Sequence, residues 1–219
     1  MQSKSDYLPN TNLLIKQHPE MFRMNTDSKL LGQFIKIKKS DTVLDLGCNN
    51  GVLMMYASLH KPKHLYGVDL FEEALNLAKE NLEANGITNF DLIQGDATEV
   101  KLPNVDVIVC NPPYFKTVDE HRKNDNPYRA AARHEGSLTL DKLMSVCEKT
   151  LSDHGHLFLV HRPLRITEIF TEALKTSLRP RTMCLVYDVN KEEAVSVLLE
   201  FHKNYKGDLH VLKPITIER

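Results

Sequence analysis

The residues of this sequence best suited to chemistry are four in a row, Asn111-Pro112-Pro113-Tyr114. Asn111 offers a side-chain carbonyl acceptor and Tyr114 a flat aromatic face. The two prolines stiffen the backbone and carry no N–H donor, so their carbonyl oxygens can accept hydrogen bonds. Such a group can hold a planar exocyclic amine, with two acceptors on its N–H groups and one ring stacked beneath it. Acceptors on those hydrogens return electron density to the nitrogen, which transfer of an alkyl group to that nitrogen requires. We therefore take the tetrapeptide as the candidate catalytic motif.

The position of the tetrapeptide supports this interpretation. It follows the apolar run 105–110, which predicts a buried strand. Open α/β sheets bind their ligands at the carboxyl ends of strands. A proline-rich loop that merely ends a strand is the alternative, and for an isolated Pro-Pro-Tyr it would be preferred. A loop of the kind that binds nucleotides lies earlier in the chain, and we therefore prefer the catalytic interpretation.

That earlier loop, residues 47–51, joins a predicted strand (42–46) to a predicted helix (52–59). A tight Gly-containing turn between a strand and a helix lets a ligand approach the backbone closely. A nicotinamide dinucleotide site would carry the pattern G-x-G-x-x-G. Asn49 and Val52 stand where the second and third glycines would be, so the sequence excludes that cofactor.

Two acidic residues follow later predicted strands. Asp69 ends the strand 64–68, about 20 residues after the first glycine of the loop, where a carboxylate can accept hydrogen bonds from two ribose hydroxyls. Its alternative function is to cap the next helix. Asp96 follows the strand 90–94 and can accept from an adenine amino group, although a simple turn residue is an equally good interpretation.

The remaining pattern alternates helices with strands and ends on two strands. Helices are predicted at 27–37, with an N-cap at Thr26-Asp27, and at 71–85, 138–151 and 163–177; further strands are predicted at 155–161, 183–187 and 195–201. Since only a short charged loop joins the last two strands, they form a hairpin, and one edge of the sheet is antiparallel. We expect one α/β domain over residues 40–219 and an N-terminal extension, 1–39, whose helix packs on the site.

A long polar connection, residues 115–137, follows the tetrapeptide, and connections of this length are usually functional. Its candidate substrate-binding residues are Phe115, Lys116, Arg122, Lys123, Arg129 and Arg133. Basic side chains interleaved with aromatic ones suit a grip on single-stranded nucleic acid. Nearby acidic residues almost cancel the charge, so an ordinary solvated loop is the alternative.

The net charge, the cysteine spacing and the lack of long apolar stretches limit the possible functions of the protein further. The chain has 219 residues, a formal net charge of −1 and four scattered cysteines without a CxxC pair. We expect reduced core thiols and no metal site, and any contact with nucleic acid must come from local basic surface. Because no apolar stretch approaches the ~18–20 residues of a membrane span and no signal-peptide core is visible, we expect a cytoplasmic protein without membrane contact.

Several motifs together resemble those of known methyltransferases. They are Val43-Leu44-Asp45-Leu46-Gly47-Cys48-Asn49-Asn50-Gly51, Phe22-Arg23-Met24-Asn25-Thr26-Asp27-Ser28-Lys29-Leu30-Leu31-Gly32, Asn111-Pro112-Pro113-Tyr114-Phe115, Ala132-Arg133-His134-Glu135 and Val160-His161-Arg162-Pro163. The chain resembles the class I S-adenosylmethionine-dependent enzymes and, more specifically, the bacterial tRNA1(Val) (adenine(37)-N6)-methyltransferase family. The resemblance implies a Rossmann-like α/β fold, with a seven-stranded, mostly parallel sheet, one antiparallel edge hairpin and helices on both faces.

The resemblance also implies the cofactor, the substrate and the site. S-adenosylmethionine would be bound by Thr26, Asp27, Asp45, Gly47, Cys48, Asn49, Gly51, Asp69, Leu70, Asp96, Ala97 and Asn111. The substrate would be an adenine in the anticodon loop of a tRNA, and a monomer is favoured. The Asn111 side chain and the Pro112 carbonyl would hold the N6 amine while Tyr114 stacks on the base. The family's first loop is usually richer in glycine than Cys48-Asn49-Asn50, which leaves the backbone here less open to the cofactor.

Four other functions remain as alternatives. Methylation of release-factor glutamine uses the same tetrapeptide, but those enzymes carry a helical N-terminal domain, and only about 40 residues precede the first predicted strand here. Guanine-N2 methylation of ribosomal RNA also acts on a planar exocyclic amine. DNA adenine methylation is disfavoured because no separate sequence-recognition domain is present. A catalytically dead RNA-binding module would fail to bind the cofactor.

Overall fold

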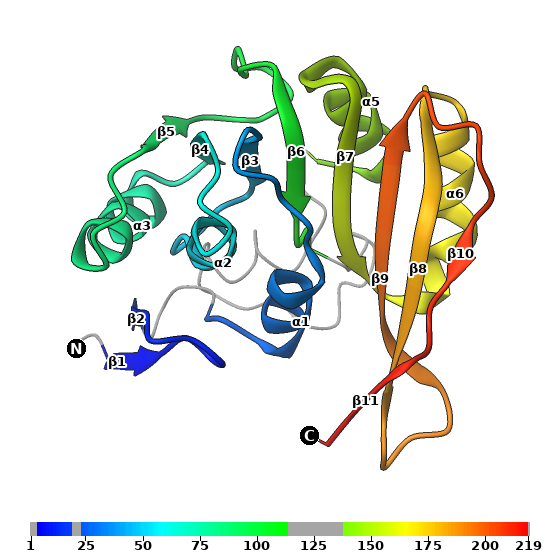
Figure 1. The fold of residues 1–219 in the computed structure, drawn as a ribbon, viewed down its shortest axis with the longest axis horizontal. Helices are drawn as coiled ribbons and strands as arrows, with labels where there is room; N and C mark the ends of the chain where they lie inside the picture. The colour runs from blue at the N-terminus through cyan, green and yellow to red at the C-terminus, as the bar shows by residue number, and fades with distance from the viewer. Residues whose placement is uncertain (1–3, 19–22, 114–137, 219) are drawn as a thin grey trace, which may run out of the picture.

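A computed structural model of the chain describes residues 4–18, 23–113 and 138–218. The strands of its main sheet are β3 (Thr42–Leu46), β4 (His64–Asp69), β5 (Phe90–Gln94), β6 (Val105–Cys110), β7 (Leu151–His161), β8 (Leu178–Asp188), β9 (Ala194–Lys203), β10 (His210–Val211) and β11 (Ile215–Ile217). They lie in the order β10-β8-β9-β7-β6-β3-β4-β5, with β11 also paired to β8 (Figure 1). All seven predicted strands are therefore present in one sheet.

The strand directions also agree with the prediction. Strands β5, β4, β3, β6 and β7 run parallel, whereas β9 is antiparallel to both β7 and β8. The two short strands β10 and β11 come from the tail, which the sequence pattern did not place, and both pair in parallel with β8. They cover backbone groups that an open sheet edge would leave unpaired.

Helices cover both faces of the sheet. They are α1 (Thr26–Phe34), α2 (Val52–Ser58), α3 (Glu72–Ala84), α5 (Leu140–Thr150) and α6 (Ile166–Leu174), the last preceded by a 3-10 helix at Pro163–Arg165. Two separate hydrophobic clusters fill the two interfaces, one built with α1, α2 and α3 and the other with α5 and α6. Successive side chains of a strand point to opposite faces of the sheet, so one strand contributes to both clusters. In β3, Val43 lies in the first cluster and Leu44 in the second.

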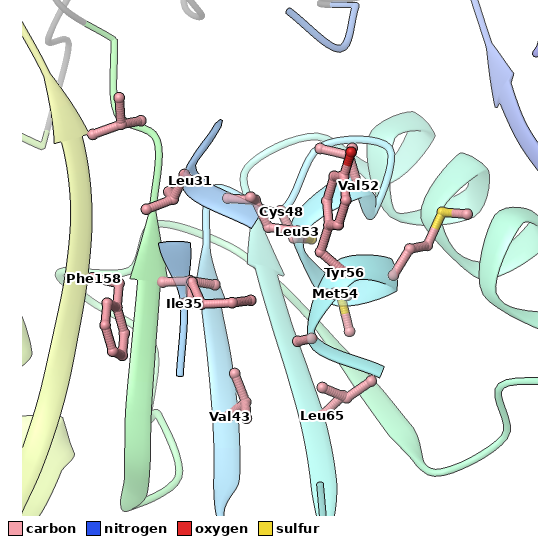
Figure 2. Packing of buried hydrophobic residues seen from close by; sticks show 14 of the residues in the cluster. Leu31, Ile35, Val43, Cys48, Val52, Leu53, Met54, Tyr56, Leu65 and Phe158 are labelled. Carbon is pink, nitrogen blue, oxygen red and sulfur yellow. The ribbon is translucent and has the colours of Figure 1, made fainter. Parts of the chain in front are cut away.

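The first cluster fixes helices α1 and α2 against the sheet. In Figure 2, Ile35 from the α1 segment lies between Phe158 of β7 and Val43 of β3, and Leu31 lies above them in the same cluster. Helix α1 also packs tightly on α2, because a Cβ atom added at Gly32 would lie 2.2 Å from the Tyr56 ring. A side chain on α1 is therefore held in a fixed position relative to the strands beneath it.

The beginning of α1 corrects one prediction. The N-cap is Asn25, not Thr26-Asp27, and the Asn25 side chain accepts a hydrogen bond from the Ser28 backbone N–H at 2.8 Å. Asn25 has an extended backbone (φ −121°, ψ 177°), which suits a cap, whereas Thr26 already belongs to the helix.

An N-terminal hairpin was not predicted. Strands β1 (Lys4–Tyr7) and β2 (Leu14–Gln17) pair antiparallel in a small sheet of their own. Two asparagines, one in α3 and one at its C-cap, hold β2: Asn81 Oδ1 accepts from Lys16 N at 2.7 Å, and Asn85 Oδ1 accepts from Leu14 N at 2.9 Å. The hairpin therefore depends on a helix much later in the chain.

Candidate active site

Most of the predicted site residues lie where the parallel strands end. Asp45 is near the end of β3, Asp69 ends β4, Asp96 follows β5 and Asn111 follows β6. Backbone hydrogen bonds join these ends, since Gly47 N donates to Val68 O and Gly95 N donates to Asp69 O, both at 2.9 Å. The topology thus brings together residues that are far apart in the sequence, at the edge where α/β sheets bind ligands.

The loop after β3 combines two left-handed glycines with different surroundings. Gly47 (φ +76°) has no heavy atom within 4 Å of the position a Cβ would occupy, so the space beside its backbone is open. A Cβ at Gly51 (φ +78°) would lie 3.2 Å from Ala78, so close packing on α3 and the backbone conformation both favour glycine there. The opening for a ligand is therefore at Gly47.

The same loop holds buried polar atoms that lack partners among the described residues. They are both carboxylate oxygens of Asp45, Oδ1 of Asn49 and Nδ2 of Asn50. Burial and, less strongly, the Asp69 carboxylate raise the pKa of Asp45 well above its usual range; the nearby Met54 backbone N–H, which is not in hydrogen-bonding geometry with either oxygen, offsets only part of this rise. A buried carboxylate without a hydrogen bond is costly, and a cationic ligand would relieve that cost. Asn50 was not among the predicted site residues, although a second asparagine within a glycine-flanked turn was a usable signal.

Asp69 shapes this loop directly. Its Oδ2 accepts from Asn49 N at 2.9 Å, and its Oδ1 accepts from Phe71 N at 3.1 Å. Burial raises the pKa of Asp69, and these backbone hydrogen bonds oppose the rise. Phe71 is the N-cap of α3, so Asp69 is not the helix cap of the alternative interpretation. The next residue, Leu70, is 48% exposed beside the carboxylate.

Asp96 occupies a turn at the end of β5. Its Oδ1 accepts from the backbone N–H of Thr98 at 2.9 Å and from the Thr98 hydroxyl at 2.7 Å. The following residue, Ala97, packs against the second hydrophobic cluster. These bonds fix the carboxylate in the turn and are compatible with both functions considered for Asp96.

Asn111 is joined to α1. Its side-chain Nδ2 donates to the Ser28 hydroxyl oxygen at 2.9 Å, and Pro112 beside it is buried. Ser28 was not predicted as a site residue, because the two positions are far apart in the sequence. Its place three residues after an asparagine N-cap was the available signal.

The other predicted residues of α1 have different surroundings. Asp27 is buried, and its Oδ1 accepts from the Ser196 hydroxyl of β9 at 2.6 Å, while Thr26 is half-buried. The bond of Asp27 ties α1 to the antiparallel strand of the sheet. Tyr114 and the predicted substrate-binding residues Phe115, Lys116, Arg122, Lys123, Arg129 and Arg133 lie outside the described residues.

The cysteines and the metal-ligand residue types add no further site within the described ranges. All four cysteines are buried and free, and burial raises the pKa values of Cys48 and Cys110 well above the usual range. Among residues 4–18, 23–113 and 138–218, no group of three or more His, Cys, Asp or Glu side chains could hold a metal ion. Within those same ranges, no helix is both long and apolar enough to cross a membrane.

Comparison with known proteins identifies the family. Residues 12–181 match the model of the methyltransferase small domain. The tRNA1(Val) (adenine(37)-N6)-methyltransferase of Proteus mirabilis is 30% identical over 209 residues, which cover 90% of this chain and 78% of that protein. The enzyme of that name from Aeromonas salmonicida is 31% identical over 180 residues, 81% of this chain and 75% of its own. The chain belongs to the methyltransferase small domain family, among relatives named tRNA1(Val) (adenine(37)-N6)-methyltransferases.

Solved structures of other proteins confirm the fold. A methyltransferase from Pyrococcus furiosus aligns with a TM-score of 0.66 at 18% identity, covering 90% of this chain and 92% of that one. TYW2 from M. jannaschii, crystallised in complex with AdoMet, aligns with a TM-score of 0.60 at 15% identity, covering 92% of this chain and 86% of its own. The predicted Rossmann-like class I methyltransferase fold is therefore correct.

The AdoMet in the TYW2 structure is S-adenosylmethionine, and the loop residues of this chain fit that cofactor. This cofactor carries a cationic ammonium and a cationic sulfonium, whereas the buried Asp45 carboxylate has no hydrogen-bond partner among the described residues. The open space beside Gly47 allows a ligand to lie against the backbone. Charge and space thus agree with the cofactor.

Proposed function

We propose that this protein transfers a methyl group from S-adenosylmethionine to N6 of an adenine in tRNA, namely A37 beside the anticodon of tRNA1(Val). The observation that carries the proposal is the position of Asn111 and Pro112, which follow β6 at the same sheet edge as Asp45 and Asp69. An acceptor for an exocyclic amine and carboxylates suited to a cationic cofactor thereby share one edge. The names of the relatives supply the base and the tRNA.

The cofactor would lie along the ends of β3, β4 and β5, and it supplies an electrophilic methyl group on its sulfonium. Asp45, Gly47 and Cys48 would face its methionine end, Asp69 its ribose, and Asp96 with Ala97 its adenine. Asn49 and Gly51 would shape the loop, and Leu70, Thr26 and Asp27 would close the site. The contacts of Asp69 and Asp96 with backbone N–H groups support these roles, because they hold the carboxylates in place before a ligand binds.

Asn111 and Pro112 would hold the substrate amine. The Asn111 side-chain oxygen and the Pro112 carbonyl oxygen accept its two hydrogens, which restores the nucleophilic lone pair on nitrogen. Displacement is direct, and positioning supplies much of the rate. No strong base is needed, because the nitrogen becomes cationic on alkylation and then readily loses a proton to water. The Tyr114 ring would stack on the base.

The target base must leave its stack to reach this edge, and that is least costly in a loop of single-stranded RNA. An anticodon-loop purine meets this requirement. We propose Phe115, Lys116, Arg122, Lys123, Arg129 and Arg133 as the residues that hold the RNA. The proposed organisation is an extension, 1–39, that closes over the cofactor and a catalytic domain, 40–219, in a cytoplasmic monomer.

The test is methyl transfer resolved to the nucleoside. The purified protein is incubated with labelled S-adenosylmethionine and tRNA that lacks modifications, and the RNA is then digested to nucleosides. We expect the label in N6-methyladenosine. Label in N2-methylguanosine would replace the base, and label only in a protein glutamine would replace the substrate class. No transfer together with no cofactor binding would favour a catalytically dead RNA-binding module.

Substitution of Asn111 tests its role within the same assay. We expect Asn111→Ala to lower the transfer rate on the order of 10²–10³-fold, the usual cost of removing one preorganised polar group from the reacting centre. The dissociation constant for the cofactor should stay within about twofold, because the lost acceptor faces the amine. Loss of cofactor binding in this variant would contradict the assignment.

A further inference from the structure

We propose that Ser28 is a positioning residue, which determines the direction in which the Asn111 side-chain amide faces. Asn25, the N-cap of α1, determines in turn the direction of the Ser28 hydroxyl. The consequence for catalysis rests on the proposed function, in which the Asn111 oxygen receives the substrate amine. The orientation itself follows from hydrogen bonds between Asn25, Ser28 and Asn111.

The series of hydrogen bonds starts from a group that can act only as a donor. The backbone N–H of Ser28 can only donate, and it points at the Asn25 side chain at 2.8 Å. The Asn25 atom that it meets must therefore be the carbonyl oxygen, Oδ1. The extended backbone of Asn25 and its position as N-cap keep that oxygen over the first turn of α1.

The second bond uses the only hydrogen of the Ser28 hydroxyl. Ser28 Oγ lies 3.1 Å from the same Asn25 Oδ1, which can only accept. The hydroxyl hydrogen therefore points toward Asn25. With that hydrogen used, Ser28 Oγ can take part in another hydrogen bond only as an acceptor.

The third bond orients the candidate catalytic side chain. Asn111 lies 2.9 Å from Ser28 Oγ, and because Oγ accepts there, the Asn111 atom must be the donor Nδ2. The carbonyl Oδ1 is then on the opposite side of the amide. Rotation of the amide by half a turn would bring two oxygens together at Ser28 and lose this hydrogen bond.

The orientation matters because the two sides of an amide have opposite hydrogen-bonding properties. An exocyclic amine presents hydrogens, so it needs the Asn111 oxygen and would be repelled by the Asn111 NH2 group. A freely rotating asparagine would spend part of its time in the wrong orientation. A fixed one is preorganised for the amine, which is how positioning contributes to rate.

Burial and packing hold Asn25, Ser28 and Asn111 in fixed positions relative to one another. Ser28 is only 2% exposed, so water is a poor substitute for its hydroxyl. Helix α1 is tied to β9 through the Asp27–Ser196 hydrogen bond and is packed on α2 through Gly32 and Tyr56. The Ser28 hydroxyl is thereby presented to the end of β6 by an element that cannot easily shift.

Kinetics of four variants test the consequence for transfer. We expect Ser28→Ala to lower kcat by about 10-fold or more while the cofactor dissociation constant changes by less than about twofold. Ser28→Thr, which keeps a hydroxyl, should recover most of the rate, and Asn25→Asp should retain it because a carboxylate both accepts and caps. Ser152→Ala is the matched control: the half-buried Ser152 hydroxyl donates to Asp106 Oδ1 at 3.0 Å, near the opposite ends of the strands. It should leave kcat unchanged.

A double-mutant cycle separates positioning from a general structural effect. If Ser28 acts through Asn111, adding Ser28→Ala to Asn111→Ala should produce no further loss of transfer. An independent, additive loss on the Asn111→Ala background would overturn the proposal. Ser28→Cys keeps the side-chain volume but offers a poor acceptor, and it serves the same cycle if Ser28→Ala does not fold.

A spectroscopic measurement tests the orientation without any substrate. In ¹⁵N-labelled protein, the Asn111 side-chain NH2 signals are identified by their disappearance in Asn111→Asp. We expect these signals to shift and to exchange faster with water in Ser28→Ala but not in Ser28→Thr or Ser152→Ala. Unchanged signals in Ser28→Ala would overturn the inference. If the signals change while wild-type protein methylates no adenine, the proposed function fails and the orientation stands.

Discussion

Two buried carboxylates at different places in the sheet show how a site differs from a scaffold. Asp45 on β3 is 1% exposed, and Glu200 on β9 is 3% exposed. Asp45 has no hydrogen-bond partner in the part of the chain that the structure describes, whereas Glu200 accepts from Thr182 Oγ1 at 2.6 Å and from Arg181 at 3.1 Å and lies 3.0 Å from His156 Nδ1. The two carboxylates are therefore almost equally buried, but only Glu200 has hydrogen-bond partners.

The pKa values of the two carboxyl groups differ in direction for the same reason. Burial raises the pKa of Asp45 well above its usual range. Burial also acts to raise that of Glu200, but hydrogen bonds from His156 and Thr182 and the charge of Arg181 outweigh it and lower the pKa to about 2. A buried carboxylate satisfied by the protein stabilises the fold, and one left unsatisfied beside an open loop is suited to a ligand.

Truncation of Glu200 should have the largest effect on stability. We expect Glu200→Ala to lower the free energy of unfolding by about 3–5 kcal/mol, because it leaves Arg181 and Thr182 without their acceptor and opens a cavity. Denaturant unfolding measures the loss. A change below about 1 kcal/mol would show that the paired carboxylate is not a structural element.

Replacement of Asp45 should act in the opposite direction. In Asp45→Asn the buried charge is removed with little change of shape, so we expect the free energy of unfolding without cofactor to stay equal or rise by up to about 2 kcal/mol. Thermal unfolding of the cofactor-free protein checks this. Marked destabilisation would mean that Asp45 is paired in the folded protein, and the contrast with Glu200 would disappear.

The pH dependence of stability should separate the two groups further. The folded pKa of Glu200, about 2, is below its usual 4.5, so its contribution is present above pH 4.5 and is lost as the pH falls toward 2. The folded pKa of Asp45 is raised, so its contribution is present below the usual 3.8 and is lost as the pH rises through the folded pKa. The deficit of Glu200→Gln relative to wild type should therefore shrink on acidification. The advantage of Asp45→Asn should grow from pH 3.8 upward; melting temperatures over this range that move in parallel would contradict both assignments.

Loss of an exposed ion pair should have the smallest effect on the free energy of unfolding. Lys16 Nζ and Glu80 are only 2.6 Å apart, but both side chains are exposed. We expect Glu80→Gln to change the free energy of unfolding by less than about 1 kcal/mol. A loss as large as that of Glu200→Ala would show that distance, not burial, sets the value of these pairs.

The sequence predicted the sheet because its strands are separate apolar runs. The central strands Thr42–Leu46 and Val105–Cys110 are buried on both faces and read as continuous apolar runs, whereas the edge strand Phe90–Gln94 is only partly buried. The β1–β2 hairpin escaped prediction because its backbone is held by Asn81 of α3 and by Asn85 at the C-cap of that helix, which no local pattern reveals. Strands β10 and β11 are short and depend on the edge of β8 for pairing.

The site was predictable to the extent that strand ends define it. Asp69, Asp96 and Asn111 could be placed because each follows or ends a recognisable strand, whereas Asp45, inside its strand, was placed by the family resemblance. The bond between Ser28 and Asn111 could not, since it joins two elements through tertiary packing. The sequence did contain a signal for Glu200, a charged residue within the apolar run Val195–Phe201, but not the partners that satisfy it. The roles of Tyr114 and the 115–137 connection stay predictions.

The most direct test of whether the unpaired Asp45 carboxylate marks the cofactor site is the affinity of the protein for S-adenosylmethionine. Isothermal titration calorimetry would compare the wild-type protein with Asp45→Asn and with Glu200→Gln, under conditions where all three are folded. We expect Asp45→Asn to bind at least about 10-fold more weakly, the value of a hydrogen bond to a charged group, and Glu200→Gln to bind like wild type. Equal affinity of Asp45→Asn and wild type, or a selective loss in Glu200→Gln, would contradict the account.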